Sequence, residues 1–136
     1  MKIFTKEIFE KLVANGRQQE PVRGTEDEID FAPVVKLFTP DANCTWLLTE
    51  IEAEYPEIAF GLCDLGMGFP ELGNVSLAEL AALRGKLGLP IERDRHFEAA
   101  HSLSVYADAA RQGDAITEDP QKLAQAAAAQ EDERSF

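Results

Sequence analysis

The side chains best suited to nucleophilic or metal chemistry in this sequence are two cysteines and two histidines. A cysteine nucleophile needs a histidine base beside it, and a zinc site needs several thiolate or imidazole ligands. No C-x-x-C or H-x-x-x-H spacing brings such groups together, and the four residues stand apart in the chain: Cys44, Cys63, His96 and His101. Both cysteines lie in strand-like runs, and we interpret them as reduced core residues. The sequence therefore predicts no catalytic residue, no metal site and no cofactor, and it disfavours an enzyme.

A row of carboxylates is the second candidate for chemistry. Glu50, Glu52 and Glu54 occupy every second position, which on a strand places them on one face about 7 Å apart. We expect this row to continue the strand face that carries Trp46 and Leu48, and to become exposed toward the strand end. Like charges this close favour water or a basic partner. The row is therefore either a binding surface for a basic partner or a solvated acidic face. The predicted partner-binding residues are Glu50, Glu52, Glu54, Glu57 and Asp64.

The third candidate is the stretch from Gly61 to Pro70, which sets three glycines and an acid among large apolar residues. Glycine permits positive φ or the close approach of another segment, so this stretch is typical of a pocket wall or of a bulge and turn. It contains no phosphate-binding glycine motif. A small-molecule or nucleotide site is the alternative prediction, combining the glycine loop with a later basic run: Asp64, Gly66, Gly68, Arg93, Arg95 and His96. An internal salt-bridge network is the other interpretation of the basic run.

The charge of the chain restricts its partners. The 136 residues contain 13 Lys and Arg against 25 Asp and Glu, which gives a net charge of −12. Eleven acids and a single lysine fall between residues 25 and 74. A chain this acidic repels nucleic acid, so we expect no direct contact with DNA or RNA. No apolar run is long enough to span a membrane, and we expect a cytoplasmic protein.

The elements that must position these residues follow from periodicity. The sequence predicts a helix from Thr5 to about Asn15, stopped by Gly16, and then a polar loop over residues 17–30. The period next changes to that of strands, with connections too short for parallel crossovers. We expect three main antiparallel strands and a shorter fourth: Val34–Phe38, Thr45–Ile51, Ile58–Leu65 and Gly73–Val75.

The second half of the chain predicts more helix. An S-x-x-E capping box from Ser76 to Glu79 begins a helix that we expect to end near Arg84 or Lys86. Residues 90–97 alternate as an edge strand does. Ser102 or Ser104 begins a last helix to about Arg111, and no core pattern follows Gln112.

These elements predict a small α+β fold: an antiparallel sheet of three or four strands packed against two or three helices. We expect residues 1–111 to form a single domain. Residues 112–136 are expected to form an acidic, alanine-rich tail that is flexible or a solvated helix.

Several blocks between residues 33 and 94 resemble, in order, a family of short bacterial proteins described only as a domain of unknown function. The blocks are PVVKLFTP at 33–40, TWLLTEI at 45–51, AFGLCDLG at 59–66, PELG at 70–73 and LGLPIERD at 87–94. The resemblance implies a context rather than an activity. Proteins of this family resemble cargo of plasmids, integrative conjugative elements and phages, where small acidic proteins often counter restriction or CRISPR defence.

Charge and resemblance together favour an acidic, non-enzymatic interaction protein of a mobile genetic element. We expect it to inhibit or modulate a host nucleic-acid-targeting defence protein, in the manner of an anti-CRISPR or anti-restriction protein. Its partner would be a basic surface of that host protein, for instance a nuclease. The alternatives are the ligand-binding protein described above and a subunit whose apolar faces complete an oligomer, since the sequence leaves the oligomeric state open.

Overall fold

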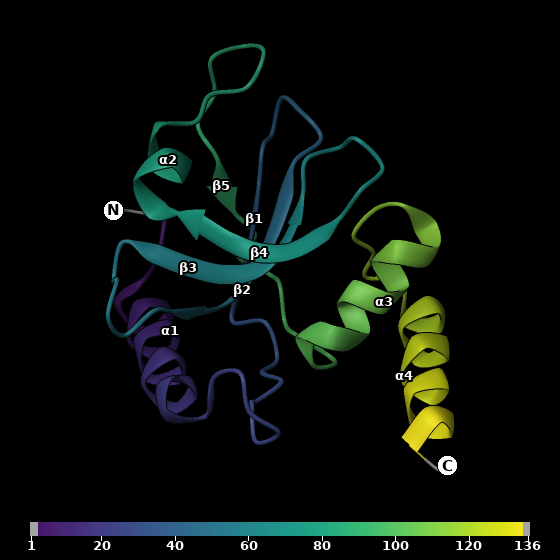
Figure 1. Ribbon diagram of the computed structural model, residues 1–136. Helices are drawn as coiled ribbons and strands as arrows, with labels where there is room; N and C mark the ends of the chain where they lie inside the picture. Colours follow the sequence, from purple (N-terminus) through teal and green to yellow (C-terminus); the bar gives the residue numbers. More distant parts are fainter. Residues whose placement is uncertain (1–2, 135–136) are drawn as a thin grey trace.

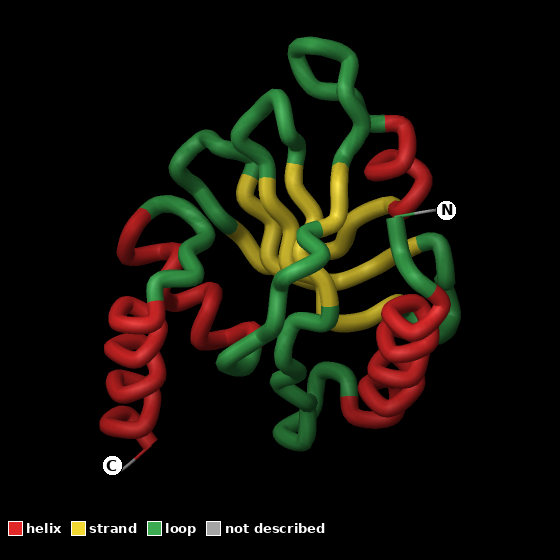
Figure 2. Tube along the Cα trace, turned by 180° about the vertical axis from the view of Figure 1, so that it is seen from behind, coloured by secondary structure: helices red, strands yellow, loops and turns green. Residues whose placement is uncertain are grey.

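Alternating side chains of the central strands divide this protein into two apolar layers, one on each face of a sheet. The computed structural model describes residues 3–134, in which five antiparallel strands are ordered β4-β3-β2-β1-β5 (Figures 1 and 2). The strands are β1 (Val35–Phe38), β2 (Thr45–Ile51), β3 (Ile58–Asp64), β4 (Glu71–Ser76) and β5 (Glu92–Arg93). The α+β class with an antiparallel sheet is confirmed, with five strands where three or four were expected.

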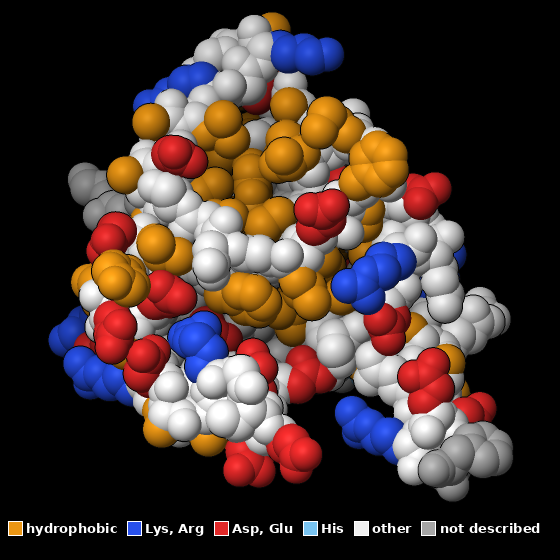
Figure 3. Space-filling view, viewed as in Figure 1, with side chains coloured by type: hydrophobic (Ala, Val, Ile, Leu, Met, Phe, Trp, Pro, Cys, Tyr) orange, Lys and Arg blue, Asp and Glu red, His pale blue; other side chains and the backbone are white. Residues whose placement is uncertain are grey.

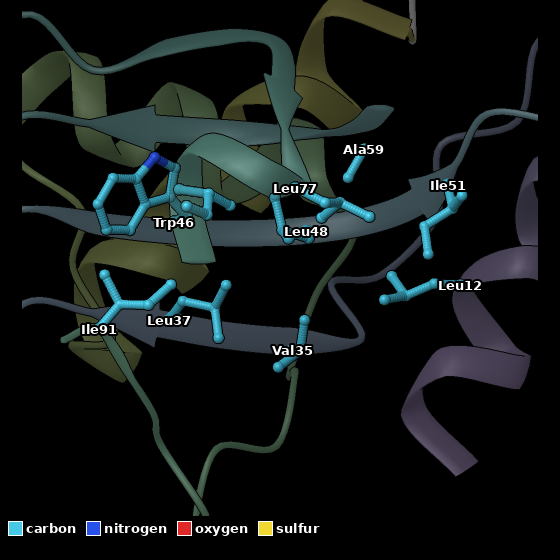
Figure 4. Packing of buried hydrophobic residues seen from close by; sticks show 10 residues of the cluster. Leu12, Val35, Leu37, Trp46, Leu48, Ile51, Ala59, Leu77 and Ile91 are labelled. Carbon is cyan, nitrogen blue, oxygen red and sulfur yellow. The ribbon is translucent and has the colours of Figure 1, made fainter. Parts of the chain in front are cut away.

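Helices α1 (Lys6–Gln19) and α2 (Leu77–Ala82) cover the first face. Leu12 of α1 and Leu77 of α2 join the buried side chains of β1 and β2 in one cluster (Figure 4). Both helices begin as the sequence predicts, because each cap forms within a single turn. The Thr5 hydroxyl accepts from the Ile8 amide, and the Ser76 hydroxyl accepts from the Glu79 amide.

The end of α1 differs from the prediction. Gly16 does not stop the helix, which continues to Gln19 and into a short 3-10 turn, η1 (Glu20–Val22). Gly16 is buried, and a Cβ added to it would meet the Ile51 carbonyl oxygen. The glycine therefore serves the packing of α1 on β2. Helix α2, in contrast, ends earlier than expected, at Ala82.

Helices α3 (Leu103–Gly113) and α4 (Pro120–Arg134) lie on the second face, which β2 and β3 supply with Leu47 and Leu62. Figures 1 and 2 show this helix pair and α1 apart from each other on either side of the sheet. We expected no core pattern beyond Gln112, and here the structure differs. Leu123 and Ala126 of α4 are buried against α3, while most other α4 side chains are exposed.

Candidate functional site

A β-bulge in β2 changes where its acidic residues point. Leu48 pairs with Gly61, but Glu50 pairs with the next residue back, Phe60, so the register shifts by one residue at Thr49. Because side chains alternate along a strand, the extra residue moves Glu50 to the face of Phe60 and leaves Ile51 on the face of Leu48. The prediction that Glu50 continues the Trp46 face and becomes exposed was therefore wrong. Glu50 is only 2% exposed.

The Glu50 carboxylate is incompletely satisfied. Its Oε1 accepts a hydrogen bond from the Thr49 hydroxyl at 3.1 Å. Its Oε2 has no hydrogen-bond partner among the described residues, and neither does Nη2 of Arg23, which lies 3.7 Å away. Burial, with a smaller effect of the Glu28 charge, raises the pKa of Glu50 above its ordinary value, against the opposing effects of the Thr49 hydroxyl, the Gln19 amide and the Arg23 charge. A buried polar atom without a partner is uncommon in folded proteins and needs an explanation.

Glu50 borders a cavity of about 400 Å³, which we name the Glu50 cavity. Segments far apart in sequence form it: the end of α1, the α1–β1 connection, β2, β3, β4, the first turn of α3 and the end of α4. Figure 3 shows the molecule hollowed below the sheet, between that connection and the C-terminal helix. Its lining residues are Gln19, Arg23, Glu28, Ile29, Asp30, Phe31, Thr49, Glu50, Phe60, Leu72, Leu103, Ser104 and Arg134. Sequence reasoning did not assemble this site, since only the Glu50 spacing drew attention to any part of it.

The other predicted acids divide into buried and exposed groups. Asp64 is 5% exposed and accepts hydrogen bonds from the amides of Gly66 at 2.9 Å and Ile116 at 3.0 Å. It therefore ties the glycine loop to the segment after α3, and the prediction that it faces a partner was wrong. Glu54 and Glu57 are exposed in the β2–β3 turn, and Glu52 is half-buried beside Arg23. The acids that remain accessible form a shorter row than expected.

The alternative ligand site is not assembled as a single pocket. Arg93, Arg95 and His96 line one hollow together with Glu92 and Asp94, whose carboxylates offset their charge. Asp64, Gly66 and Gly68 line a second hollow beside it. Gly66 and Gly68 have φ of 77° and 84°, so both glycines are required by the turn itself.

The cysteines and the described acids offer little for catalysis or metal binding. Burial, with a smaller effect of the Glu71 charge, raises the pKa of the Cys63 thiol to about 11. Cys63 is thus protonated at neutral pH, where only a thiolate would act as a nucleophile. Within residues 3–134 no three His, Cys, Asp or Glu side chains lie close enough together to hold a metal ion. The same residues include no helix with the length and apolar character of a membrane span.

A second concave surface, which we name the apolar hollow, lies between the glycine loop and α2. Hydrophobic side chains line a depression above β4 in Figure 3. Its volume is about 430 Å³, and its apolar lining comprises Cys44, Trp46, Leu65, Met67, Val75, Leu80 and Leu83. Leu65 and Met67 are 52% and 69% exposed on its rim. The sequence signal for the apolar hollow is the unusual composition of residues 61–70. The prediction from this stretch used its glycines and not its apolar side chains.

Strand β4 borders the apolar hollow and forms one edge of the described sheet. The Leu77 amide donates to the Glu57 carbonyl, and hydrogen-bonded pairs recur at every second residue of an antiparallel ladder. The backbone groups of Leu72 and Asn74 therefore point away from β3. Edge groups of this kind can accept a further strand.

Comparison with known proteins identifies the family. Residues 3–117 match the family described as "Protein of unknown function (DUF2958)". The chain belongs to this family. The DUF2958 match covers the whole sheet, helices α1 to α3 and the Asp64–Ile116 contact, and it ends before α4. No curated protein and no solved structure gives a significant match to the chain.

Proposed function

We propose that this DUF2958 protein is a non-enzymatic interaction protein that binds a basic partner protein through the apolar hollow and the neighbouring edge of β4. The observation that carries the proposal is the exposure of Leu65 and Met67 around a concave apolar surface. Large apolar side chains gathered around a depression are typical of protein-binding sites. An extended segment of the partner would pair with β4 and place apolar side chains in the hollow.

The charge of the protein supports a basic partner. Glu79 lines the apolar hollow, and Glu57 lies beside the start of α2, because its carbonyl accepts from the Leu77 amide. Both acids are exposed, as is Glu54 in the same turn as Glu57. Because the chain carries a net charge of −12, a second copy would meet repulsion at this surface, whereas a basic partner would be attracted.

We further propose that the partner is a host protein that targets nucleic acid, and that binding inhibits or modulates it in the anti-CRISPR or anti-restriction manner. Proteins that hold DNA or RNA carry basic surfaces, which an acidic protein can occupy in place of phosphates. The mobile-element context of the proposal comes from the family resemblance. The predicted acids contribute through Glu52, Glu54 and Glu57, since Glu50 and Asp64 are buried.

The test is a pull-down of the tagged full-length protein from its bacterial host at low salt and at about 0.5 M salt, where surface charges are screened. We expect to recover a basic nuclease or nucleic-acid-binding protein, less of it at high salt. Replacing Leu65 and Met67 by serine should abolish recovery, because both side chains rim the hollow. Neutralising Glu52, Glu54 and Glu57 to Gln should weaken it.

The matched control is Phe9→Ser, which removes a side chain that is 47% exposed on α1, outside the apolar hollow and the acidic turn. Recovery that survives the Leu65 and Met67 variant, or that falls equally with Phe9→Ser, would contradict the docking surface. Trp46 gives a second readout with the purified partner, because it is the sole tryptophan and lines the hollow. Its fluorescence should change on binding.

A further inference from the structure

We propose that the Glu50 cavity binds a small organic cation, whose guanidinium, amidinium or ammonium head donates to Glu50 Oε2 and whose apolar body lies against Phe31 and Phe60. This site is separate from the apolar hollow, with which it shares no lining residue. Binding at the Glu50 cavity can therefore be tested separately from binding at the apolar hollow.

Glu50 carries the unsatisfied acceptor of this cavity. Glu50 Oε2 is buried without a hydrogen-bond donor, although the bulge at Thr49 directs this side chain to the cavity face. A buried acceptor without a hydrogen-bond donor is among the more destabilising features that a fold can retain. A ligand N–H group donating to Oε2 would remove that deficit.

Arg23 does not supply the missing hydrogen bond to Glu50. Its guanidinium lies 3.7 Å from Glu20, 3.7 Å from Glu50 and 3.8 Å from Glu52, all beyond the range of a normal hydrogen bond. One guanidinium therefore faces three carboxylates, and its side chain is 34% exposed. A second cation beside Glu50 would improve the local balance of charge.

The walls of the cavity select the rest of the ligand. Ile29, Leu72 and Leu103 are apolar, and Phe31 and Phe60 add aromatic rings that attract cations. Asp30 is occupied, because it accepts from both the amide and the hydroxyl of Ser104. Gln19 is also occupied, by the backbone of Ile29. Glu28 accepts from the Gly24 amide. Glu50 Oε2 is thus the buried acceptor left for a ligand head, and an anionic ligand would be repelled by it.

The volume sets the size of the ligand. About 400 Å³ lies at the lower end of the range of small-molecule pockets, which suits a compact cation with a single ring or a short alkyl stem. A flat amidinium can present two parallel N–H groups to a carboxylate, as arginine does. Benzamidine has this head on a single aromatic ring, and it is therefore the probe of choice.

The experiment titrates benzamidine into the full-length protein at pH 7 and low salt, followed by amide chemical shifts. We expect saturable binding with Kd on the order of millimolar, with shifts concentrated at residues that line the cavity. Benzamide has nearly the same shape without the charge. It should bind at least about tenfold more weakly, since a hydrogen bond to a charged group supplies that difference.

The matched variants are Glu50→Gln and Glu54→Gln, which remove one negative charge each, inside and outside the cavity. Glu50→Gln should weaken benzamidine binding about tenfold or more, whereas Glu54→Gln should leave Kd within about twofold. Absence of saturable binding, equal binding of benzamide, or unchanged affinity in Glu50→Gln would each overturn the proposal. The benzamide comparison needs no variant, so it decides the question even if Glu50→Gln does not fold.

Discussion

A Cβ placed on Gly16 would lie 1.7 Å from the carbonyl oxygen of Ile51. Helix α1 therefore packs on strand β2 with backbone against backbone at this point. The adjacent Asn15 strengthens the contact, because its side-chain amide donates to the Thr49 carbonyl at 2.9 Å. The bulge that directs Glu50 into its cavity is thus held from the α1 side, which links the packing of one helix to the geometry of the candidate site.

Gly16→Ala should destabilise the protein by about 2 kcal/mol or more, because α1 must move away from β2 to admit the methyl group. Gly113→Ala is the control, since Gly113 is also helical and an added Cβ there has nothing within 4 Å. It should be neutral or slightly stabilising, in line with helix propensity. Urea unfolding of both variants measures the difference, and equal stabilities would contradict the proposed contact.

Asp64→Ala should release the segment that follows α3. The two carboxylate oxygens accept from Gly66 and Ile116, so the substitution leaves two amides without partners and should cost about 2 kcal/mol. Hydrogen exchange should become faster at the Ile116 amide in particular. Asp27→Ala provides the same change at an exposed site and should alter neither quantity. Unchanged protection of Ile116 in Asp64→Ala would show that the contact contributes nothing.

Glu50→Gln should change the pH dependence of stability. Because burial raises the pKa of Glu50, the folded state binds this proton more readily than the unfolded chain does. The free energy of unfolding therefore falls as pH rises above 4.5, the ordinary pKa of a glutamate, because Glu50 then ionises in its buried position. Glutamine resembles the protonated acid, so the variant should match the wild type near about pH 4 and exceed it in stability at about pH 7.

Urea unfolding of both proteins at the two pH values measures this effect. Other acids titrate identically in the two proteins, so the difference between them isolates Glu50. A variant that is less stable than the wild type at neutral pH would mean that the ion pair with Arg23 outweighs the desolvation of Glu50.

Cys63 should resist alkylation in the folded protein. With a pKa of about 11, about one thiol in a thousand is ionised at pH 8, and the thiolate is the reactive form. Mass spectrometry of the protein treated with iodoacetamide should show slow modification of Cys63, which becomes faster as pH rises. Protein unfolded in urea is the control, and equally rapid modification of the folded protein would contradict the raised pKa.

Leu123→Ala should test whether α4 contributes to the fold. Leu123 is 2% exposed against α3, so its truncation should cost about 2 to 4 kcal/mol. Leu87→Ala is the matched control, because Leu87 is 80% exposed and its truncation should change stability little. Thermal unfolding measures both. A negligible effect of Leu123→Ala would indicate that α4 adds little to stability, as expected for the solvated tail that composition predicts over residues 112–136.

Features that depend on neighbouring residues could be predicted from the sequence. The caps at Thr5 and Ser76 form within one helical turn, so their side chains and spacing specify them. The antiparallel order of β1 to β4 follows from connections too short for a crossover. The same period of two that located β2, however, placed Glu50 on the wrong face.

The candidate sites depend on contacts that the sequence does not display. The bulge at Thr49 arises from pairing with β3 and packing of α1, and a shift of one residue reverses the face of Glu50. Asp64 is buried because its partner, Ile116, lies 52 residues away in the chain. The apolar hollow exists because α2 and the glycine loop stand apart above the sheet.

The sequence by itself determined the α+β class, the strongly acidic charge and the starts of the two capped helices, because these properties are sums or short-range patterns along the chain. Only the tertiary structure decided which acids are buried, which glycine serves packing and where two cavities open. Those outcomes depend on the register and close approach of distant segments, which neither composition nor spacing encodes.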